Sequence, residues 1–371
     1  MSAGDGGLLR FGVLGAANIA RAFIAGVKPS ARLVVAAIGS RDAGKAERFA
    51  RETGVARWHG TYEQLLADPD IDAIYNPLPN SLHAEWTIRA CRAGKHVLCE
   101  KPLAISPTEA RAMFEAAAQN GVCLMEGYPY RAQPQTIRLL ELVAAGEIGR
   151  LQLIQSSFGF TLPAGPNIRL DAGLAGGALM DAGTYPVSLV RMVAGERPVR
   201  VQAQALWADG VDRALAATLE FDSGLLAQIS CSFSTGAHRQ ALIAGTGGVI
   251  QSAFQNHPPL DRPAEILLKR GTGWDSDYER VQVPALNGFL AEAEAFADLV
   301  AARGVRVAST GGLNTTTGGL ASAAGRVPAR GAPAVAPHIA GASAEESIDI
   351  AMMLAAILRS ARSGQVQRVS D

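Results

Sequence analysis

The stretch FGVLGAANIA, residues 11–20, runs from an apolar strand pattern directly into a helical pattern. A full G-x-G-x-x-G sequence turns the chain tightly, lets its backbone approach a pyrophosphate and packs the helix on the strand. Gly15 takes the first glycine position, while Ala17 and Ala20 replace the second and third. Alanine at the second position leaves less room for a phosphate, so a plain strand-to-helix turn stays an alternative. If the turn binds a dinucleotide, its contacts are Gly15, Ala16, Ala17, Asn18 and Ile19.

The first third of the chain alternates short apolar runs with helical patterns, which is typical of βαβ units around a parallel sheet. Helix starts follow from capping chemistry. Ser106 and Glu109 have capping-box spacing, and Pro107 occupies the first helical position. We therefore predict an N-terminal α/β domain. Its expected strands are Leu9–Leu14, Leu33–Ile38, Ala73–Asn76, His96–Cys99 and Val122–Met125.

The end of the second expected strand indicates which dinucleotide the turn would bind. Residues 39–42 read Gly-Ser-Arg-Asp, with no acid directly after Ile38 to accept hydrogen bonds from the ribose hydroxyls of NAD. Ser40 and Arg41 can instead donate to a 2′-phosphate, and Lys45 lies one helical turn further on. The sequence therefore favours NADP over NAD, although Arg41 can also be read as a solvated helix-start residue.

From about Leu151 the residue pattern of the chain changes, because Gln, Ser and Thr now alternate with the apolar residues. This alternation predicts an antiparallel sheet with one packed face and one face available for other contacts. Residues 222–224, Asp-Ser-Gly, are typical of a hairpin turn. The expected strands of this second domain are Leu151–Thr161, Val199–Trp207, Ala214–Phe221 and Leu225–Phe233.

Residues 303–342 contain no acidic residue, no lysine and no aromatic residue, so we predict a flexible or irregular insertion. Helical character returns at Ala344. Acidic residues stand in its first turn, and apolar residues from Ile350 to Leu358 share one face.

Composition excludes several classes of protein. The 371 residues carry 34 basic and 34 acidic side chains, so no net field would attract a nucleic acid or a membrane. The four cysteines form no CxxC pair, which favours reduced, buried thiols, and we predict no metal site. The N-terminus lacks the apolar stretch of a signal peptide, and no run of about 18 apolar residues occurs. We expect a cytoplasmic protein.

Two further motifs carry a family resemblance. Residues 75–83 read YNPLPNSLH and residues 94–102 read GKHVLCEKP. With the glycine turn, they resemble the glucose–fructose oxidoreductase, inositol dehydrogenase and MocA-like family, most specifically at Glu100-Lys101-Pro102. The resemblance implies a catalytic Lys101 at the carboxyl end of a parallel strand, where open α/β sheets bind ligands, and a cis peptide bond before Pro102. The cofactor contacts that it implies are Pro77, Leu78, Asn80, His83, Glu100 and Lys101.

The resemblance also implies a domain organisation. We assign an NADP-binding Rossmann domain to residues 1–126. A substrate-binding and oligomerisation α+β domain with a large, mostly antiparallel open sheet is assigned to residues 127–343. Residues 344–371 are expected to form a helix that packs back on the Rossmann domain. Homodimers or homotetramers are expected, since members of this family often pair through their open sheets.

Residues 176–185, GGALMDAGTY, resemble the family's second active-site stretch. If this stretch is helical, Asp181 and Tyr185 share a face, because they are four residues apart. A tyrosine at the position of Tyr185 is similar to the sugar and dihydrodiol dehydrogenase branch. The alternative is that Tyr185 anchors a helix bent by Pro186.

Two arginines lie in segments that also resemble this branch: Arg131 in Glu126–Arg131 and Arg169 in Asn167–Asp171. Each is able to orient substrate hydroxyls or the cofactor's amide. Each fits a structural ion pair equally well, so both interpretations stay open.

The resemblance implies an NADP-dependent oxidoreductase that moves a hydride between nicotinamide and a hydroxyl or carbonyl carbon of a sugar or cyclic polyol. An ordinary tyrosine has a pKa near ~10, so a cation is needed to favour its phenolate, and Lys101 can supply that charge. We expect Tyr185 to carry the proton and Lys101 to tune it and to bind the substrate oxygen. Asp181 would hold a sugar hydroxyl or orient Lys101.

Three alternatives stay open. Lys101, rather than Tyr185, is the close competitor as proton carrier. A nicotinamide-dependent glycosidase with no net redox change would use the same family scaffold. A catalytically silent regulator that binds the cofactor is a third possibility, which the retained Lys101 and Tyr185 argue against.

Overall fold

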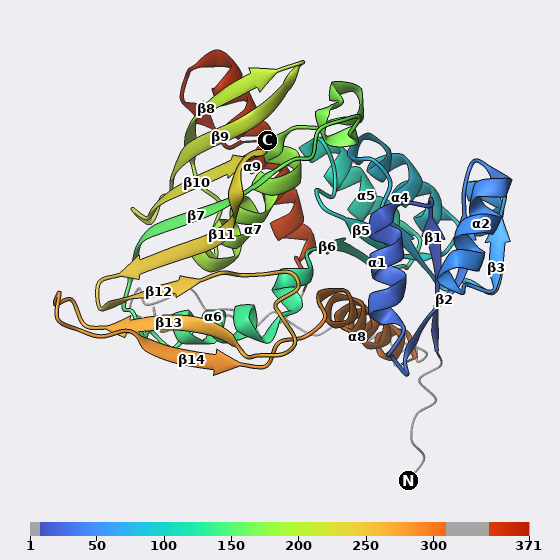
Figure 1. The fold of residues 1–371 in the computed structure, drawn as a ribbon, viewed down its shortest axis with the longest axis horizontal. Helices are drawn as coiled ribbons and strands as arrows, with labels where there is room; N and C mark the ends of the chain where they lie inside the picture. The colour runs from blue at the N-terminus through green and yellow to red at the C-terminus, as the bar shows by residue number, and fades with distance from the viewer. Residues whose placement is uncertain (1–7, 309–340, 371) are drawn as a thin grey trace, which may run out of the picture.

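The computed structural model describes residues 8–308 and 341–370 and contains two sheets that lie side by side (Figure 1). The first sheet has six strands in the order β3-β2-β1-β4-β5-β6, and every neighbouring pair is parallel. This is the strand order of a Rossmann fold. Its strands are β1 (Leu9–Leu14), β2 (Leu33–Gly39), β3 (Arg57–His59), β4 (Ala73–Asn76), β5 (His96–Glu100) and β6 (Leu124–Gly127).

Helices cover this sheet, and α5 (Pro107–Gln119) begins where the sequence predicts. Ser106 accepts a hydrogen bond from the Glu109 backbone and Pro107 follows it, as expected for the start of α5. The glycine turn also has its expected form, because Gly15 has a φ of 83°, which a residue with a Cβ rarely adopts. The helices are α1 (Asn18–Val27), α2 (Ala43–Thr53), α3 (Tyr62–Ala67), α4 (His83–Arg92) and α5 (Pro107–Gln119), with a short turn η1 (Asn80–Leu82) before α4.

The second sheet has nine strands in the order β14-β13-β12-β11-β7-β10-β9-β8-β15. It is antiparallel except where β7 pairs with β10, and the predicted hairpin turn joins β9 to β10, with Gly224 at a φ of 85°. The predicted fold class is therefore confirmed. The strands are β7 (Leu151–Thr161), β8 (Arg200–Ala208), β9 (Val211–Glu220), β10 (Leu226–Ser232), β11 (Ser234–Gly245), β12 (Gly248–Ser252), β13 (Ala264–Arg270), β14 (Glu279–Val283) and β15 (Gln367–Arg368).

Apolar and polar residues alternate along these strands, so the two faces of the second sheet differ. Leu215, Ala227, Ile229 and Ile243 are buried against the helices on one face. The helices of this layer are α6 (Pro134–Ala144), α7 (Thr184–Ala194) and α9 (Ala344–Ser363), and α9 also packs against α5 of the first layer. Helix α9 thus packs on the Rossmann layer and on the second layer as well. It can do so because apolar residues surround it on several sides.

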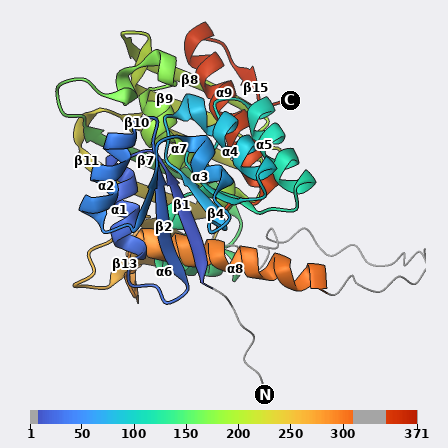
Figure 2. The ribbon, with the colours of Figure 1, turned by 90° about the vertical axis from the view of Figure 1, so that its right-hand side faces the viewer.

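Helix α8, Gly288–Ala308, differs from the sequence prediction in two respects. Residues 303–308 are helical rather than irregular, because extending a formed helix costs little. Although these residues fall in the range assigned to the second domain, α8 packs beside α1 and the parallel sheet (Figure 2), where Phe289 and Phe296 join the core around Phe11 and Phe23. The rest of the predicted insertion, residues 309–340, lies outside the described residues.

Three expectations concern the molecule as a whole. All four cysteines are buried and unpaired, as expected. No helix in the described ranges is both long and apolar enough to span a bilayer. Within the same ranges, no cluster of three or more His, Cys, Asp and Glu side chains has the spacing of a metal site.

Candidate active site

A cavity of about 300 Å³ lies where the carboxyl ends of the parallel strands face the second sheet. The start of α1 and the loops that follow β4 and β5 form one wall, and β7, β11 and the segment before α7 form the other. Open α/β sheets bind their ligands at this edge. The residues that line the cavity include Ile19, Pro77, Leu78, Asn80, His83, Glu100, Lys101, Phe158, Phe160, Arg169, Asp181, Tyr185, Arg239, Asn256 and His257.

Lys101 follows β5 and points its ammonium into this cavity. Its Nζ donates to Asp181 Oδ1 at 3.0 Å and to the Asp181 carbonyl oxygen at 3.1 Å. Burial lowers the pKa of Lys101, but the charges of Asp181, Tyr185 and Glu100 outweigh burial, so the pKa of Lys101 lies above its usual value. The ammonium therefore stays protonated at neutral pH. The peptide bond between Lys101 and Pro102 is cis, as the resemblance implies.

Asp181 is the shared partner of two cations. Its Oδ2 accepts a hydrogen bond from Arg169 Nε at 2.7 Å, while Oδ1 faces Lys101. Burial would raise the pKa of Asp181, but Lys101 and Arg169 together lower it below the usual range. Of the two roles expected for Asp181, the structure shows contacts suited to orienting Lys101. Arg169 lines the cavity wall and also forms an ion pair with Asp181, so its position fits both of the roles considered for it.

The segment that carries Asp181 is a π-helical turn, Leu179–Gly183, rather than the regular helix considered from sequence. The preceding glycines make this turn possible. Gly177 has a φ of 117°, and a Cβ at this position would lie 2.2 Å from Asp212 Oδ1. Asp212 Oδ2 in turn accepts a hydrogen bond from the Leu179 backbone at 2.7 Å and so fixes the start of the turn. Asp181 and Tyr185 nevertheless line the same cavity.

Tyr185 lies in the first turn of α7, inside an aromatic cluster. Its ring meets those of Tyr128 and Phe158 edge to face, at centroid distances of 5.6 and 5.5 Å. Lys101 Nζ lies 5.0 Å from the ring centroid, and Arg239 Cζ lies 4.2 Å from it. The Tyr185 hydroxyl accepts a hydrogen bond from Asn256 Nδ2 at 2.9 Å. Two cations thus lie close enough to stabilise negative charge on this side chain.

The residues expected to hold the adenosine half of a cofactor lie around the glycine turn. Asp42 caps α2 by accepting from the Lys45 backbone, so its carboxylate is occupied. Burial raises the pKa of Tyr62, and the nearby Arg41 guanidinium offsets part of that rise. A Cβ on Gly15 would lie 3.6 Å from the Tyr62 hydroxyl, so Arg41 is close to the turn. Ser40 is buried at the end of β2, whereas the Arg41 and Lys45 side chains are exposed.

Several expected cofactor residues line the cavity. Ile19 does so from the start of α1, and Pro77 and Leu78 from the loop after β4. His83 is buried, with its ring nitrogens 2.7 Å from the Leu78 carbonyl oxygen and 2.8 Å from that of Pro102. This contact joins the loop after β4 to the Lys101 segment. Burial lowers the pKa of His83, which favours its neutral form.

Asn80 and Glu100 also make contacts that support the cavity wall. Asn80 Nδ2 donates to the Ala175 carbonyl oxygen at 2.9 Å and so ties the first layer to the segment before Asp181. Glu100 Oε1 accepts a hydrogen bond from the Tyr75 hydroxyl at 2.5 Å. Burial raises the pKa of Glu100, so this carboxyl gains a proton more readily than an exposed one.

Arg131 lies apart from the other predicted site residues. Its guanidinium is buried and donates to Glu346 Oε1 at 2.8 Å and to Ser188 Oγ at 3.4 Å. It is not among the residues that line the cavity. The structural ion pair, rather than cofactor or substrate contact, is therefore the interpretation that these contacts support, because a buried charge requires a partner.

Sequence reasoning missed several residues of the cavity wall, among them Phe158, Phe160, Arg239 and Asn256. Phe158 and Phe160 alternate along β7, which is a visible signal for one face of a strand. Arg239 pairs with Phe158 across β11 and β7, but the sequence contains no sign of that register. Asn256 lies in the loop after β12, and nothing in its local sequence distinguishes it from a turn residue.

Comparison with known proteins adds independent findings. Residues 9–128 match a family described as oxidoreductases with an NAD-binding Rossmann fold, and residues 136–251 match the GFO/IDH/MocA C-terminal domain. A D-xylose 1-dehydrogenase (NADP(+)) of Haloferax volcanii is 42% identical over 255 residues, which are 67% of this chain and 78% of that protein. A trans-1,2-dihydrobenzene-1,2-diol dehydrogenase of Danio rerio is 34% identical over 247 residues, which are 66% and 74% of the two chains.

Among solved structures, a 3-ketoreductase of Actinomadura kijaniata in complex with NADP and TDP-benzene has a TM-score of 0.78 to this chain. The two proteins are 28% identical, and the match covers 95% of this chain and 98% of the ketoreductase. The similarity therefore extends over both sheets and the cavity between them.

Proposed function

Because this chain belongs to the GFO/IDH/MocA family of oxidoreductases, we propose that it is an NADP-dependent enzyme acting on sugars or related cyclic polyols. The reaction transfers a hydride between nicotinamide and a carbon that bears a hydroxyl or a carbonyl oxygen. The observation that carries this proposal is the convergence of Lys101, Asp181 and Tyr185 at the carboxyl edge of the parallel sheet. The xylose and dihydrodiol dehydrogenases among its relatives support the choice of substrate class.

The described residues fit a dinucleotide with a 2′-phosphate. Gly15 leaves the turn after β1 open to a pyrophosphate, and the backbone N–H groups at the start of α1 face the same edge. Ser40 and Arg41 follow β2 with no acid directly after the strand, and the carboxylate of Asp42 is turned to the backbone at the start of α2. Bound nicotinamide would supply or accept the hydride.

Lys101 and Tyr185 have different roles at the substrate oxygen: one donates a hydrogen bond to it, and the other transfers the proton. Asp181 accepts two of the three hydrogen bonds that an ammonium can donate, which leaves one Lys101 proton for the substrate oxygen. Because the pKa of Lys101 is raised, its ammonium gives up a proton less readily than an ordinary lysine does. Tyr185 therefore carries the proton, and Lys101 stabilises the oxygen on which charge develops.

A substrate panel tests the proposal directly. Aldoses, keto-sugars and cyclic dihydrodiols are offered with NADP and NAD in both directions, and nicotinamide absorbance is followed. We expect turnover with NADP on at least one member of the panel. Release of a free sugar from a glycoside without net absorbance change would replace the oxidoreductase with the nicotinamide-dependent glycosidase. Absence of all turnover, with NADP bound, would favour the silent regulator.

Replacing Arg41 by alanine tests the choice of cofactor. We expect KM for NADP to rise by about 10- to 100-fold, because a charge-assisted hydrogen bond to phosphate contributes about 1.5–3 kcal/mol. KM for NAD should stay unchanged, since NAD carries no 2′-phosphate. The matched control is Arg48→Ala, an exposed arginine on α2, the helix that follows Arg41. Equal losses with both dinucleotides would show that Arg41 only maintains the helix start.

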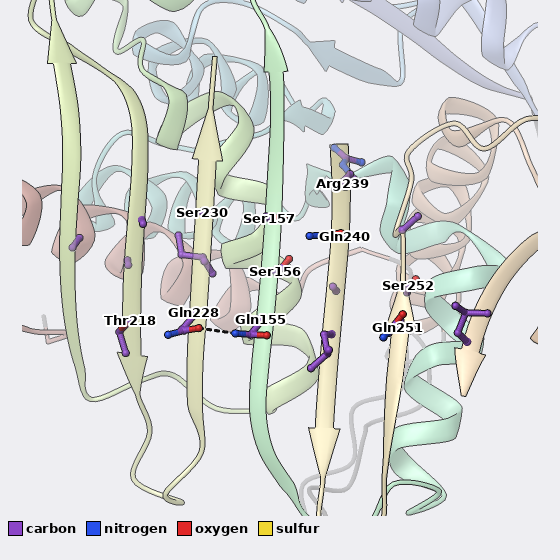
Figure 3. Close-up of a pocket in the computed structure, with 18 of the residues that line it drawn as sticks. Gln155, Ser156, Ser157, Thr218, Gln228, Ser230, Arg239, Gln240, Gln251 and Ser252 are labelled. Atoms are coloured by element: carbon purple, nitrogen blue, oxygen red, sulfur yellow. Dashed lines mark hydrogen bonds between the residues drawn. The ribbon is translucent and has the colours of Figure 1, made fainter. Parts of the chain in front are cut away.

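We propose that the chain forms homo-oligomers through the uncovered face of its second sheet. This face is hollowed by about 1150 Å³ and carries mainly uncharged polar side chains, including Gln155, Ser157, Gln228 and Gln240 (Figure 3). Gln155 and Gln228 hydrogen-bond each other at 2.7 Å across β7 and β10. An uncharged polar face is able to pair with its own copy about a two-fold axis.

Adding charge to this face should prevent the pairing. Gln155→Glu together with Gln228→Glu places like charges against their copies, which costs several kcal/mol, so we expect the dissociation constant to rise by at least about 100-fold. Sedimentation velocity across a concentration series measures the effect. Gln119→Glu, on the exposed end of α5, is the control. An unchanged dimer in the double variant would place the interface elsewhere.

A further inference from the structure

We propose that Arg239 and Asn256 are positioning residues that turn the hydroxyl proton of Tyr185 toward the reacting oxygen. This inference rests on the proposed hydride-transfer function and adds a relay of three side chains behind the proton carrier. The relay runs from a guanidinium through an amide to a phenol, and each hydrogen bond in it has a defined direction.

Arg239 is the fixed end of the relay. It lies on β11 (Figure 3), and its guanidinium packs over the rings of Phe158 and Tyr185, with Cζ to centroid distances of 4.0 and 4.2 Å. No carboxylate among the described residues forms an ion pair with it. Its Nη1 instead donates to Asn256 Oδ1 at 3.0 Å and to the Phe254 carbonyl oxygen at 3.3 Å. A guanidinium only donates, so it determines which end of the Asn256 amide faces it.

Asn256 is held at every polar atom that the relay uses. Its Oδ1 faces Arg239, so its Nδ2 must face Tyr185, to whose hydroxyl it donates at 2.9 Å. Gln133 Nε2 donates to the Asn256 backbone carbonyl at 2.9 Å and fixes the loop. Phe254, two residues earlier, has a φ of 33°, a backbone conformation that non-glycine residues adopt rarely and mainly where surrounding contacts enforce it.

The direction of these bonds decides where the Tyr185 proton points. Because the hydroxyl oxygen accepts from Asn256, its own proton must point to another acceptor. Tyr128 and Tyr130, the neighbouring phenols, are bonded to Thr184 and to Ser188. Lys101 only donates, and Asp181 is paired with Lys101 and Arg169. None of these described neighbours is a free acceptor for the Tyr185 proton, so we infer that it points to a substrate oxygen in the cavity.

The same relay serves both states of the phenol. In carbonyl reduction the nicotinamide would supply the hydride to the carbonyl carbon. The Tyr185 O–H bond breaks and that proton bonds to the substrate oxygen, which leaves a phenolate. Asn256 then donates to the phenolate oxygen, and Arg239 lies over the ring that carries the charge. In alcohol oxidation the proton returns along the same line. No reorganisation of the three side chains is needed in either direction.

Two substitutions of Asn256 separate positioning from structural support. Asn256→Asp keeps an acceptor for Arg239 but has no donor for Tyr185, and its carboxylate draws the Tyr185 proton toward itself. Asn256→Ala removes both contacts but leaves the proton free to turn to the substrate. We expect Asn256→Asp to lower kcat by about 10- to 100-fold, with KM little changed, and Asn256→Ala to lower it less. A structural role predicts the opposite order, since alanine loses more contacts.

The control is Asn120→Asp, the same chemical change at the end of α5, at the amino-terminal edge of the parallel sheet, where kcat should stay at the wild-type value. A neutron structure after exchange into heavy water shows in which direction the O–D bond of Tyr185 points, and it needs no activity assay. A deuteron pointing at Asn256, or an Asn256→Asp variant with wild-type kcat, overturns the inference. If the wild type turns over no substrate but the deuteron points into the cavity, the relay stands and the proposed function fails.

Discussion

Replacing Lys101 by methionine is expected to lower kcat by about 1000-fold, because loss of one donor to a developing oxyanion typically costs about 100- to 1000-fold. Methionine fills a similar volume, so the aromatic cluster around Tyr185 stays packed. What is lost is the ammonium that Asp181 holds at 3.0 Å, together with its free proton. Asp181 keeps Arg169 as a partner, so the carboxylate is not left without a counter-ion.

Single-turnover measurements with saturating NADP separate this effect from cofactor binding. Because the pKa of Lys101 is raised and that of Asp181 is lowered, both groups stay charged across neutral pH, and the deficit should not depend on pH there. Lys28→Met, an exposed lysine after α1, is the matched control. Retention of wild-type turnover by Lys101→Met would remove this residue from the chemistry.

Tyr185→Phe is expected to lower kcat by about 100- to 10000-fold, the range for loss of a general acid or base. Phenylalanine keeps the ring on which Lys101 and Arg239 pack, and only the hydroxyl and its bond to Asn256 disappear. KM should change little, because the missing contact matters most in the transition state. The pH dependence of kcat should also lose the limb that reports the proton carrier.

Tyr130→Phe is the control for this substitution. It removes a hydroxyl from the same aromatic cluster, one that bonds Ser188 rather than facing the cavity, and should cost about 1 kcal/mol of stability without loss of turnover. Thermal unfolding and steady-state rates of both variants give the comparison. If Tyr185→Phe keeps wild-type turnover and an unchanged pH profile, Lys101 is the proton carrier instead.

Local patterns in the sequence determined much of the fold. The strand ends Leu14 and Asn76 match the structure, as does the cap of α5, because apolar runs, glycine turns and capping residues act over a few neighbouring positions. Lys101 and Tyr185 were also visible in advance, since each lies in a motif whose residues are consecutive. The position of Lys101 at a ligand-binding edge follows from the parallel sheet, whereas Tyr185 reaches the same cavity from α7 of the second layer.

Only the tertiary structure decided which distant residues complete the site. Arg239 reaches Tyr185 because β11 pairs with β7 in one register, and a shift by one residue would have turned its side chain to the opposite face. Arg131 does not line the cavity, because its guanidinium pairs with Glu346, which lies 215 positions later on α9. Helix α8 packs against the first sheet, although it follows the strands of the second. Contacts between residues far apart in the chain depend on packing, which local sequence patterns do not encode.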